Sequence, residues 1–148
     1  MRRISILVMA IGLVLLSSLL MSQTGKSAAS PKTSNSLQAS MDRGKKVYSE
    51  RCLTCHQADG GGVQNMNPPL IKTKWVLGDK TTLIQILLKG LQGEIEIEGD
   101  TYHNVMGSHA DLSDQQIADV LTYVRNSFGN KAKSVSVADV KAVRAKTK

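Results

Sequence analysis

The sequence predicts a small all-α domain with one short β-hairpin. Several stretches carry apolar residues three and four positions apart, which is the spacing of an amphipathic helix. Only in residues 94–98 do polar and apolar residues alternate, which is the pattern of a half-buried strand. The sequence contains no internal repeat, and its only two cysteines are Cys52 and Cys55, with His56 directly after them.

The N-terminus has the features of an exported protein. After Met1-Arg2-Arg3, residues 4–20 carry no charge, and the small residues before Ser30 suit signal cleavage. The uncharged run is long for the core of a signal peptide and close to the lower limit for a membrane-spanning helix. We therefore expect residues 1–21 to be a signal peptide or an N-terminal membrane anchor. In either case the two arginines keep the rest of the chain on the extracytoplasmic side.

Residues 22–40 are rich in Ser, Thr, Ala and Gln and contain almost no large apolar side chain. Such a segment cannot bury enough surface to offset the entropy of ordering it, so we expect a flexible linker. The folded domain is then expected over residues 41–130. A basic C-terminal helix or tail is expected over residues 131–148.

The first helix of the domain is expected from Ser40, which can act as its N-cap. Gly44 and Tyr48 are four residues apart and therefore share one face of this helix. A glycine inside a helix costs about 1 kcal/mol relative to alanine, so we expect another helix to approach closely at Gly44.

A glycine- and proline-rich loop, residues 60–70, comes next, followed by a short helix that begins at Asp79 and ends at Gly90. Its predicted buried stripe is Leu83, Ile84, Leu87 and Leu88.

Residues 94–98 then read Glu-Ile-Glu-Ile-Glu, and Gly99-Asp100 predicts a turn, so we expect a hairpin that reaches Tyr102. The three glutamates lie on the solvent face of this strand, and we do not expect them to bind a metal.

The clearest helix follows Leu112. Ser113 and Gln116 form a capping box, and Leu112 and Ile117 form a hydrophobic staple across it. We expect this helix to end at Gly129 and to bury one apolar face, made of Ile117, Val120, Leu121, Val124 and Phe128.

The last helix is predicted to begin at Ser136 and to turn Val140 and Val143 inward. The lysines around it contribute to the formal net charge of +7 and form either a solvated face or a docking surface for an acidic partner. Export and an aromatic content of 3% argue against a nucleic-acid partner.

Three chemistries use two cysteines at this spacing. A redox disulfide of the thioredoxin type requires a βαβ unit, but here a helix precedes the pair and no such unit follows. A zinc site needs four ligands, and Cys52, Cys55 and His56 are too close in sequence to surround one tetrahedral ion with His103 or His109 as the fourth. Covalent haem attachment requires the whole Cys-x-x-Cys-His motif, because each thiol forms a thioether and the histidine binds the iron.

From about Met41 to Phe128 the chain resembles a class I cytochrome c domain. The motifs that carry this resemblance are "RCLTCHQADGGG", "NPPL", "LLKGLQGEIEIEGDTYHNVM" and "LSDQQIADVLTYVRNSFGN". The sequence is similar in particular to bacterial haem c modules found free or fused to sugar dehydrogenases and similar periplasmic oxidases. The resemblance implies helices wrapped around one covalent haem. It also implies that the first and last core helices cross, with Gly44 and Tyr48 against Tyr123 and Val124.

The resemblance also implies a set of haem-binding residues. Cys52 and Cys55 would attach haem c, and His56 would bind the iron. A backbone carbonyl before Leu70, that of Pro68 or else Pro69, would accept a hydrogen bond from the Nδ1–H of the histidine and fix its ring. Two aromatic residues have open roles: Trp75 either packs near the haem propionates or fills the core, and Tyr102 either closes the haem edge or fills the hairpin.

Four residues compete for the other face of the iron, namely Met66, His103, Met106 and His109. Met106 lies where the family carries its axial methionine, so we expect Met106 to be the sixth ligand. Related sequences often have proline after this methionine, whereas here Gly107 follows, and a freer loop would weaken the iron–sulfur bond.

With both axial positions filled, the expected function is one-electron transfer at the periplasmic or extracytoplasmic face of the membrane, and not catalysis. The expected partners are a dehydrogenase donor or an oxidase acceptor that docks at the exposed haem edge. One alternative is a haem subunit dedicated to one such enzyme, tethered to the membrane through residues 4–20. The other is a sensor of a gas or peroxide, which would require Met106 to dissociate easily.

Overall fold

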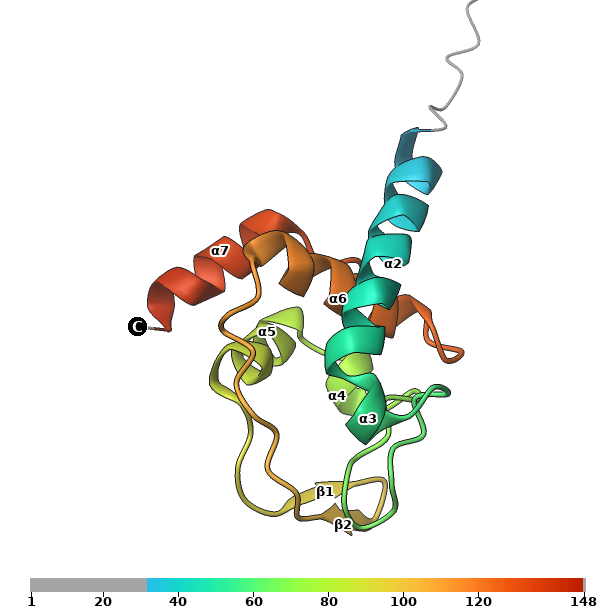
Figure 1. Ribbon diagram of the computed structural model, residues 1–148, viewed down its shortest axis with the longest axis vertical. Helices are drawn as coiled ribbons and strands as arrows, with labels where there is room; N and C mark the ends of the chain where they lie inside the picture. Colours follow the sequence, from blue (N-terminus) through green and yellow to red (C-terminus); the bar gives the residue numbers. More distant parts are fainter. Residues whose placement is uncertain (1–31, 148) are drawn as a thin grey trace, which may run out of the picture. The chain divides into compact units, whose positions relative to one another are not determined.

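The computed structural model describes residues 32–147. The predicted signal peptide or anchor, residues 1–21, lies outside these residues, as does most of the predicted linker. The elements, in chain order, are α2 (Lys32–Arg51), α3 (Leu53–His56), α4 (Lys74–Leu77), α5 (Lys80–Lys89), β1 (Ile95–Ile97), β2 (Asp100–Tyr102), α6 (Asp114–Asn126) and α7 (Val137–Lys146). Figure 1 shows the helices gathered at one end of the domain and the hairpin at the other. The predicted all-α domain with a short hairpin is confirmed.

Helix α2 begins earlier than its sequence predicts. It starts at Lys32, so residues 32–40 of the predicted linker are helical and Ser40 lies inside the helix. Ser40 donates from its hydroxyl to Asp119 of α6 at 2.5 Å and is therefore a packing residue, not an N-cap. Once the second half of α2 is fixed against α6, each residue added to its start costs little, because helix propagation is far easier than nucleation.

The crossing of α2 and α6 is centred on Gly44. A β-carbon at this position would lie 2.1 Å from the carbonyl oxygen of Asp119 and 2.8 Å from the β-carbon of Tyr123. Only a glycine lets the two backbones approach this closely, which confirms the predicted role of Gly44. Below the crossing, the rings of Tyr48, Tyr123 and Phe128 pack with centroids 5.4–5.7 Å apart.

A buried carboxylate also joins the two helices. Arg43 donates to both carboxylate oxygens of Asp119, at 2.6 and 2.8 Å, and Gln115 donates to one of them at 3.0 Å. Burial acts to raise the pKa of Asp119, but the hydrogen bonds from Arg43, Ser40 and Gln115 outweigh it and hold the pKa below its usual value.

Apart from the start of α2, the predicted helix signals agree with the structure except at the end of α6. Asp79 caps α5, Gly90 ends it, and capping boxes open α6 and α7. Helix α6 ends at Asn126, however, and not at Gly129. Phe128 and Gly129 have left-handed backbone angles, with φ of 57° and 78°, and they reverse the chain after the helix has already ended.

The hairpin pairs Ile95 with Tyr102 and Ile97 with Asp100. Its turn residues are Glu98 and Gly99, at φ of 56° and 90°, and not Gly99-Asp100. Positive φ at both positions is the signature of a two-residue type I′ turn. The turn therefore lies one residue earlier than predicted.

Arg125 links α6 to two other segments. Its guanidinium donates to the carbonyl oxygens of Val76, Gly78 and Lys133 at 2.7–3.0 Å, although the residue is only 4% exposed. These bonds fix the connection between α4 and α5 and the segment that leads to α7.

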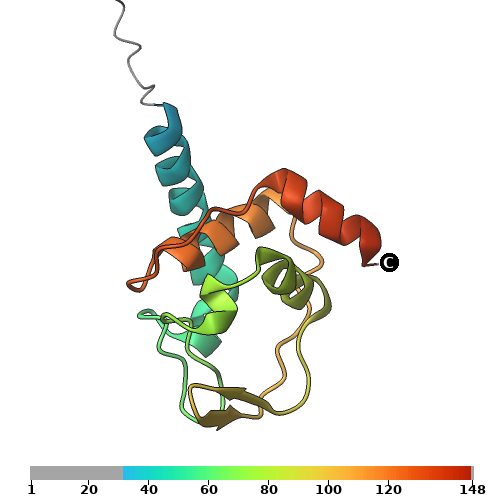
Figure 2. The ribbon, with the colours of Figure 1, turned by 180° about the vertical axis from the view of Figure 1, so that it is seen from behind.

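Figure 2 shows α7 lying at the helical end of the domain, away from the hairpin. Within residues 32–147, no helix combines the length and the apolar character needed to cross a membrane.

Candidate functional site

The Cys-x-x-Cys-His motif lies where α2 gives way to α3. The N–H of Cys52 donates to Tyr48 O, and the N–H of His56 donates to Cys52 O, both at 2.9 Å, so the motif occupies one helical turn. The Tyr48 hydroxyl donates to the carbonyl of Gln57 at 2.6 Å and fixes the end of that turn. Both thiols are free, and burial, followed by the nearby Cys55, raises the pKa of Cys52 to about 11.

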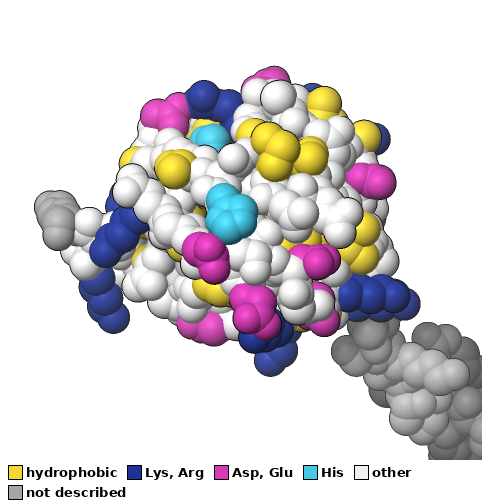
Figure 3. Space-filling view, turned by 90° about the horizontal axis from the view of Figure 1, so that it is seen from below, with side chains coloured by type: hydrophobic (Ala, Val, Ile, Leu, Met, Phe, Trp, Pro, Cys, Tyr) yellow, Lys and Arg dark blue, Asp and Glu magenta, His cyan; other side chains and the backbone are white. Residues whose placement is uncertain are grey.

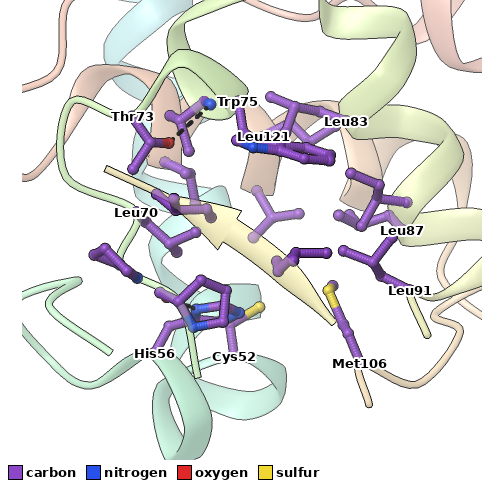
Figure 4. A pocket seen from close by; sticks show the side chains of 18 residues that line it. Cys52, His56, Leu70, Thr73, Trp75, Leu83, Leu87, Leu91, Met106 and Leu121 are labelled. Carbon is purple, nitrogen blue, oxygen red and sulfur yellow. Dashed lines mark hydrogen bonds between the residues drawn. The ribbon is translucent and has the colours of Figure 1, made fainter. Parts of the chain in front are cut away.

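An apolar pocket, here termed the inner pocket, lies above this motif. It is open to solvent on one side, and the space in it, counted out to this mouth, is about 710 Å³. Figure 4 shows its walls, with Trp75, Leu83 and Leu121 at one end and His56 and Met106 at the other. Apart from His56 and Thr73, its lining is aliphatic, aromatic or sulfur-bearing. A large, flat, apolar group fits such a lining.

A second cavity, the outer pocket, adjoins the first and encloses about 730 Å³. The two pockets share Cys52, His56 and Met106, and the outer one adds Cys55, which is exposed. The structure therefore brings the whole cysteine–histidine motif and Met106 to one connected space.

The ring of His56 is oriented by a backbone carbonyl. Its Nδ1 lies 3.0 Å from the carbonyl oxygen of Pro68, so of the two prolines considered from sequence it is Pro68 that contacts the histidine. Burial lowers the pKa of His56, the bond to Pro68 acts in the opposite direction, and His109 adds to the lowering. With Nδ1 engaged, Nε2 is the nitrogen that can bind a metal, and the neutral ring that binding requires is favoured.

Met106 is held firmly in spite of the glycine that follows it. Its N–H and C=O exchange hydrogen bonds with Leu91, both at 2.9 Å. Beyond Gly107, Ser108 donates to Leu88 O from its hydroxyl and His109 donates to Leu87 O from its backbone, both at 2.7 Å. The loop is thus bonded to Leu91 at Met106 itself and to α5 just after Gly107, and these bonds restrain it in spite of the glycine.

The three competitors of Met106 are placed less favourably. Met66 is 50% exposed, and it lines neither pocket. His103 is exposed, with its Nδ1 3.4 Å from a carboxylate oxygen of Glu94, and it also lines neither pocket. His109 lines the outer pocket only.

Of the remaining predicted residues, Leu70 and Trp75 line the inner pocket. The indole Nε1 of Trp75 is buried and has no hydrogen-bond partner among the described residues. A buried donor of this kind calls for an acceptor, and a group that enters the pocket could supply one. Tyr102 is 5% exposed but lines neither pocket, so the structure does not bring it to the site.

Some lining residues were not assigned to the site from sequence. Ile95 and Ile97 of the hairpin line the inner pocket, as does Leu91. The alternation of residues 94–98 pointed the two isoleucines inward but could not say what they face. Among residues 32–147, no group of three His, Cys, Asp or Glu side chains is placed so that it could hold a metal ion.

Comparison with known proteins bears on the same residues. The family model described as Cytochrome c matches residues 41–128. The chain is 40% identical over 113 residues to the cytochrome c-552 of Thermus thermophilus, in an alignment that covers 70% of this chain and 85% of that protein.

Two relatives are subunits of larger enzymes. The chain is 35% identical over 119 residues to the cytochrome c subunit of alcohol dehydrogenase (quinone) from Gluconacetobacter polyoxogenes, over 77% of this chain and 25% of that protein. It is 36% identical over 110 residues to the gluconate 2-dehydrogenase cytochrome c subunit of Pantoea cypripedii, over 68% of this chain and 24% of that protein. The chain therefore spans about a quarter of these subunits.

Proposed function

This chain belongs to the cytochrome c family, and from that premise we propose that it is an exported one-electron carrier whose haem iron is bound by His56 and Met106. Haem c is attached through Cys52 and Cys55, and the protein transfers electrons without being an enzyme in its own right. When bound, the haem supplies an iron that cycles between two oxidation states, and the protein sets the conditions under which it does so.

The arrangement of His56 and Met106 carries the proposal. Both side chains line the inner and the outer pocket, and they come from segments 50 positions apart in the sequence. Figure 4 shows the two side chains across from each other at the same end of the inner pocket. This nitrogen and this thioether sulfur would hold the haem iron, and thioether ligation would raise its reduction potential.

The chain's own residues then keep the ligands in place in both oxidation states. The Pro68 carbonyl holds the His56 ring, and the Leu91 backbone holds Met106. The aliphatic lining excludes water, which limits the solvent reorganisation that accompanies a change of charge. Because His56 and Met106 would both hold the iron and are themselves held by hydrogen bonds, this arrangement favours a carrier over a sensor of gas or peroxide.

Trp75 has a further role in this proposal. Its unpaired Nε1–H is the buried donor best suited to a haem propionate, which would satisfy an indole that otherwise has no partner. Tyr102, by contrast, is assigned to packing within the hairpin.

Export and partners follow from the sequence and the relatives. Residues 1–21 have the composition of a signal peptide or an anchor, which places the domain on the periplasmic or extracytoplasmic side. The similarity to dehydrogenase cytochrome c subunits supports a dehydrogenase as the electron donor and, as the second candidate, a role as the dedicated haem subunit of such an enzyme. An oxidase is the proposed acceptor.

Carbon monoxide binding tests the carrier proposal. The protein is produced in a host that attaches haem c, reduced, and exposed to carbon monoxide at neutral pH. We expect a covalent c-type chromophore that is reduced reversibly by one electron and whose spectrum carbon monoxide leaves unchanged. Rapid formation of a carbon monoxide complex would favour the sensor alternative, and absence of covalent haem would contradict both.

A further inference from the structure

The charges of this chain are distributed unevenly. Between Lys89 and Arg125 the sequence has no lysine or arginine, although the chain as a whole has a formal net charge of +7. Four carboxylates in this stretch belong to the hairpin and its edges, and all four residues are exposed: Glu94, Glu96, Glu98 and Asp100. This group is here termed the acidic hairpin.

The acidic hairpin lies beside the opening of the site. On β1, Ile95 and Ile97 line the inner pocket, whereas the glutamates that alternate with them are exposed. Strand β2 then leads within four residues to Met106, which lines both pockets. The solvent face of the hairpin therefore flanks the same end of the domain at which the haem would be reached.

An apolar surface adjoins these carboxylates. Val105 and Met66 are the most exposed of the large hydrophobic residues among those described, at 65% and 50%. Asn104 connects them, because its N–H donates to Met66 O at 3.2 Å and its side chain donates to Asn67 at 3.1 Å. Val105 also lines the outer pocket. The two exposed side chains, here termed the mouth patch, thus lie at the rim of the site.

Two basic side chains lie near this surface, and each has an acidic neighbour. Arg51 lines the outer pocket, as Val105 does, and is ion-paired with Asp111. His103 has its Nδ1 3.4 Å from a carboxylate oxygen of Glu94.

Of the C-terminal lysines, Lys141 and Lys146 belong to α7, which lies at the end of the domain opposite the hairpin (Figures 1 and 2), and Lys131 and Lys133 belong to the segment before it. Figure 3 looks onto the hairpin end and shows acidic side chains grouped there beside apolar ones, with lysine and arginine toward the edges.

We propose that the redox partner docks on the mouth patch and presents a rim of lysine and arginine to the acidic hairpin. An apolar centre with a charged rim is the usual anatomy of a transient interface, and complementary charge raises the rate of encounter. Of the two alternatives for the basic C-terminal segment, the inference favours a solvated face over a docking surface for an acidic partner. It rests on the proposed function, because it concerns the route by which electrons reach the same haem.

Two small oxidants of opposite charge serve as probes of this surface. The reduced full-length protein is mixed with tris(phenanthroline)cobalt(III), a cation, or with ferricyanide, an anion, over a range of ionic strength. If electrons leave beside the acidic hairpin, added salt slows the reaction with the cobalt complex and does not slow the reaction with ferricyanide. The net positive charge of the chain predicts the opposite for both probes, and that result would overturn the inference.

Matched variants locate the charge that matters. Glu94→Gln/Glu96→Gln/Glu98→Gln removes three exposed charges without changing side-chain size, and should slow the cobalt reaction about tenfold at low ionic strength. Lys131→Gln/Lys133→Gln/Lys141→Gln removes three exposed charges near α7 and should change the rate less than about twofold.

Equal effects of the two variants would overturn the docking inference while leaving the carrier function intact. A protein that carries haem c but is oxidised by neither probe would contradict the proposed function and the inference with it.

Discussion

Met106 and Leu91 exchange two backbone hydrogen bonds, each 2.9 Å long, and so pin the proposed sixth ligand to the end of α5. The two residues are 15 positions apart, and Gly90 makes their approach possible. A β-carbon at Gly90 would lie 2.5 Å from the carbonyl oxygen of Met106, and the backbone there has φ of +79°. The position of Met106 therefore depends on Gly90, which lines neither the inner nor the outer pocket.

Gly90→Ala should displace Met106 from its position. The new methyl group pushes the Met106 carbonyl away, so we expect the ferrous variant to bind carbon monoxide, whereas the parent is expected not to. Gly93→Ala is the matched control, because Gly93 has a similar φ of +91° but nothing within 4 Å of its β-carbon. Both variants suffer the backbone strain of about 1–2 kcal/mol, and only Gly90→Ala should alter ligation. Equal carbon monoxide binding by the two variants would show that strain, and not the Met106 contact, is responsible.

Gly44→Ala should destabilise the crossing of α2 and α6. Its methyl group would lie 2.1 Å from Asp119 O, so the helices must separate, at a cost of about 1–3 kcal/mol for overpacking. Lys45→Ala, on the exposed face one residue away, should change stability by less than about 0.5 kcal/mol. Guanidinium unfolding followed by far-UV circular dichroism measures both. A stable Gly44→Ala protein would mean that the helices are not in close contact there.

The free energy of unfolding should decrease in acid because Asp119 becomes protonated. Its pKa is lowered in the folded protein, so its contribution is present above the ordinary carboxyl pKa of about 4 and is lost as the pH falls through the lower folded value. The midpoint of urea unfolding, measured from pH 6 down to pH 3, should decrease more steeply in the parent than in Asp119→Asn. If the unfolding midpoint falls equally with pH in the two proteins, the ionised carboxylate of Asp119 does not stabilise the folded state.

Arg125→Met should be strongly destabilising although Arg125 is remote from the pocket mouth. Three backbone carbonyls lose their donor: that of Val76, which is buried, and those of Gly78 and Lys133, which belong to exposed residues. A buried unsatisfied group costs about 1–3 kcal/mol and the exposed carbonyls can bond to water, so a loss of about 2 kcal/mol or more is expected. Thermal unfolding of the haem-loaded protein measures it, with Arg51→Met, at an exposed ion pair, as the control that should lose less than about 1 kcal/mol. A loss no larger than that of the control would contradict the role given to Arg125.

The features that could be predicted from the sequence are those that residues close together in the chain determine. The capping box of Ser113 and Gln116 joins residues three apart, and the motif from Cys52 to His56 is one helical turn. The early start of α2 was not accessible, because it depends on Ser40 meeting Asp119, 79 positions away. No local preference records such a contact.

The same distinction applies to the candidate site. His56 and Met106 could be selected from their place in a family pattern, and Pro68 was the better of two neighbouring prolines. The two roles considered for Tyr102 could not be separated from the sequence, because its burial in the hairpin does not determine whether it faces the pocket. The firm attachment of Met106 was hidden as well, since Gly107 suggests freedom while the bonds that restrain the loop come from α5.

The most direct test of the account is the weak far-red band that methionine sulfur gives with ferric haem. The oxidised full-length protein should show this band, Met106→Ala should lose it, and Met66→Ala, on an exposed methionine, should keep it. This result would establish Met106 as the sixth ligand. Retention of the band in Met106→Ala, or its loss only in Met66→Ala, would contradict the assignment of Met106.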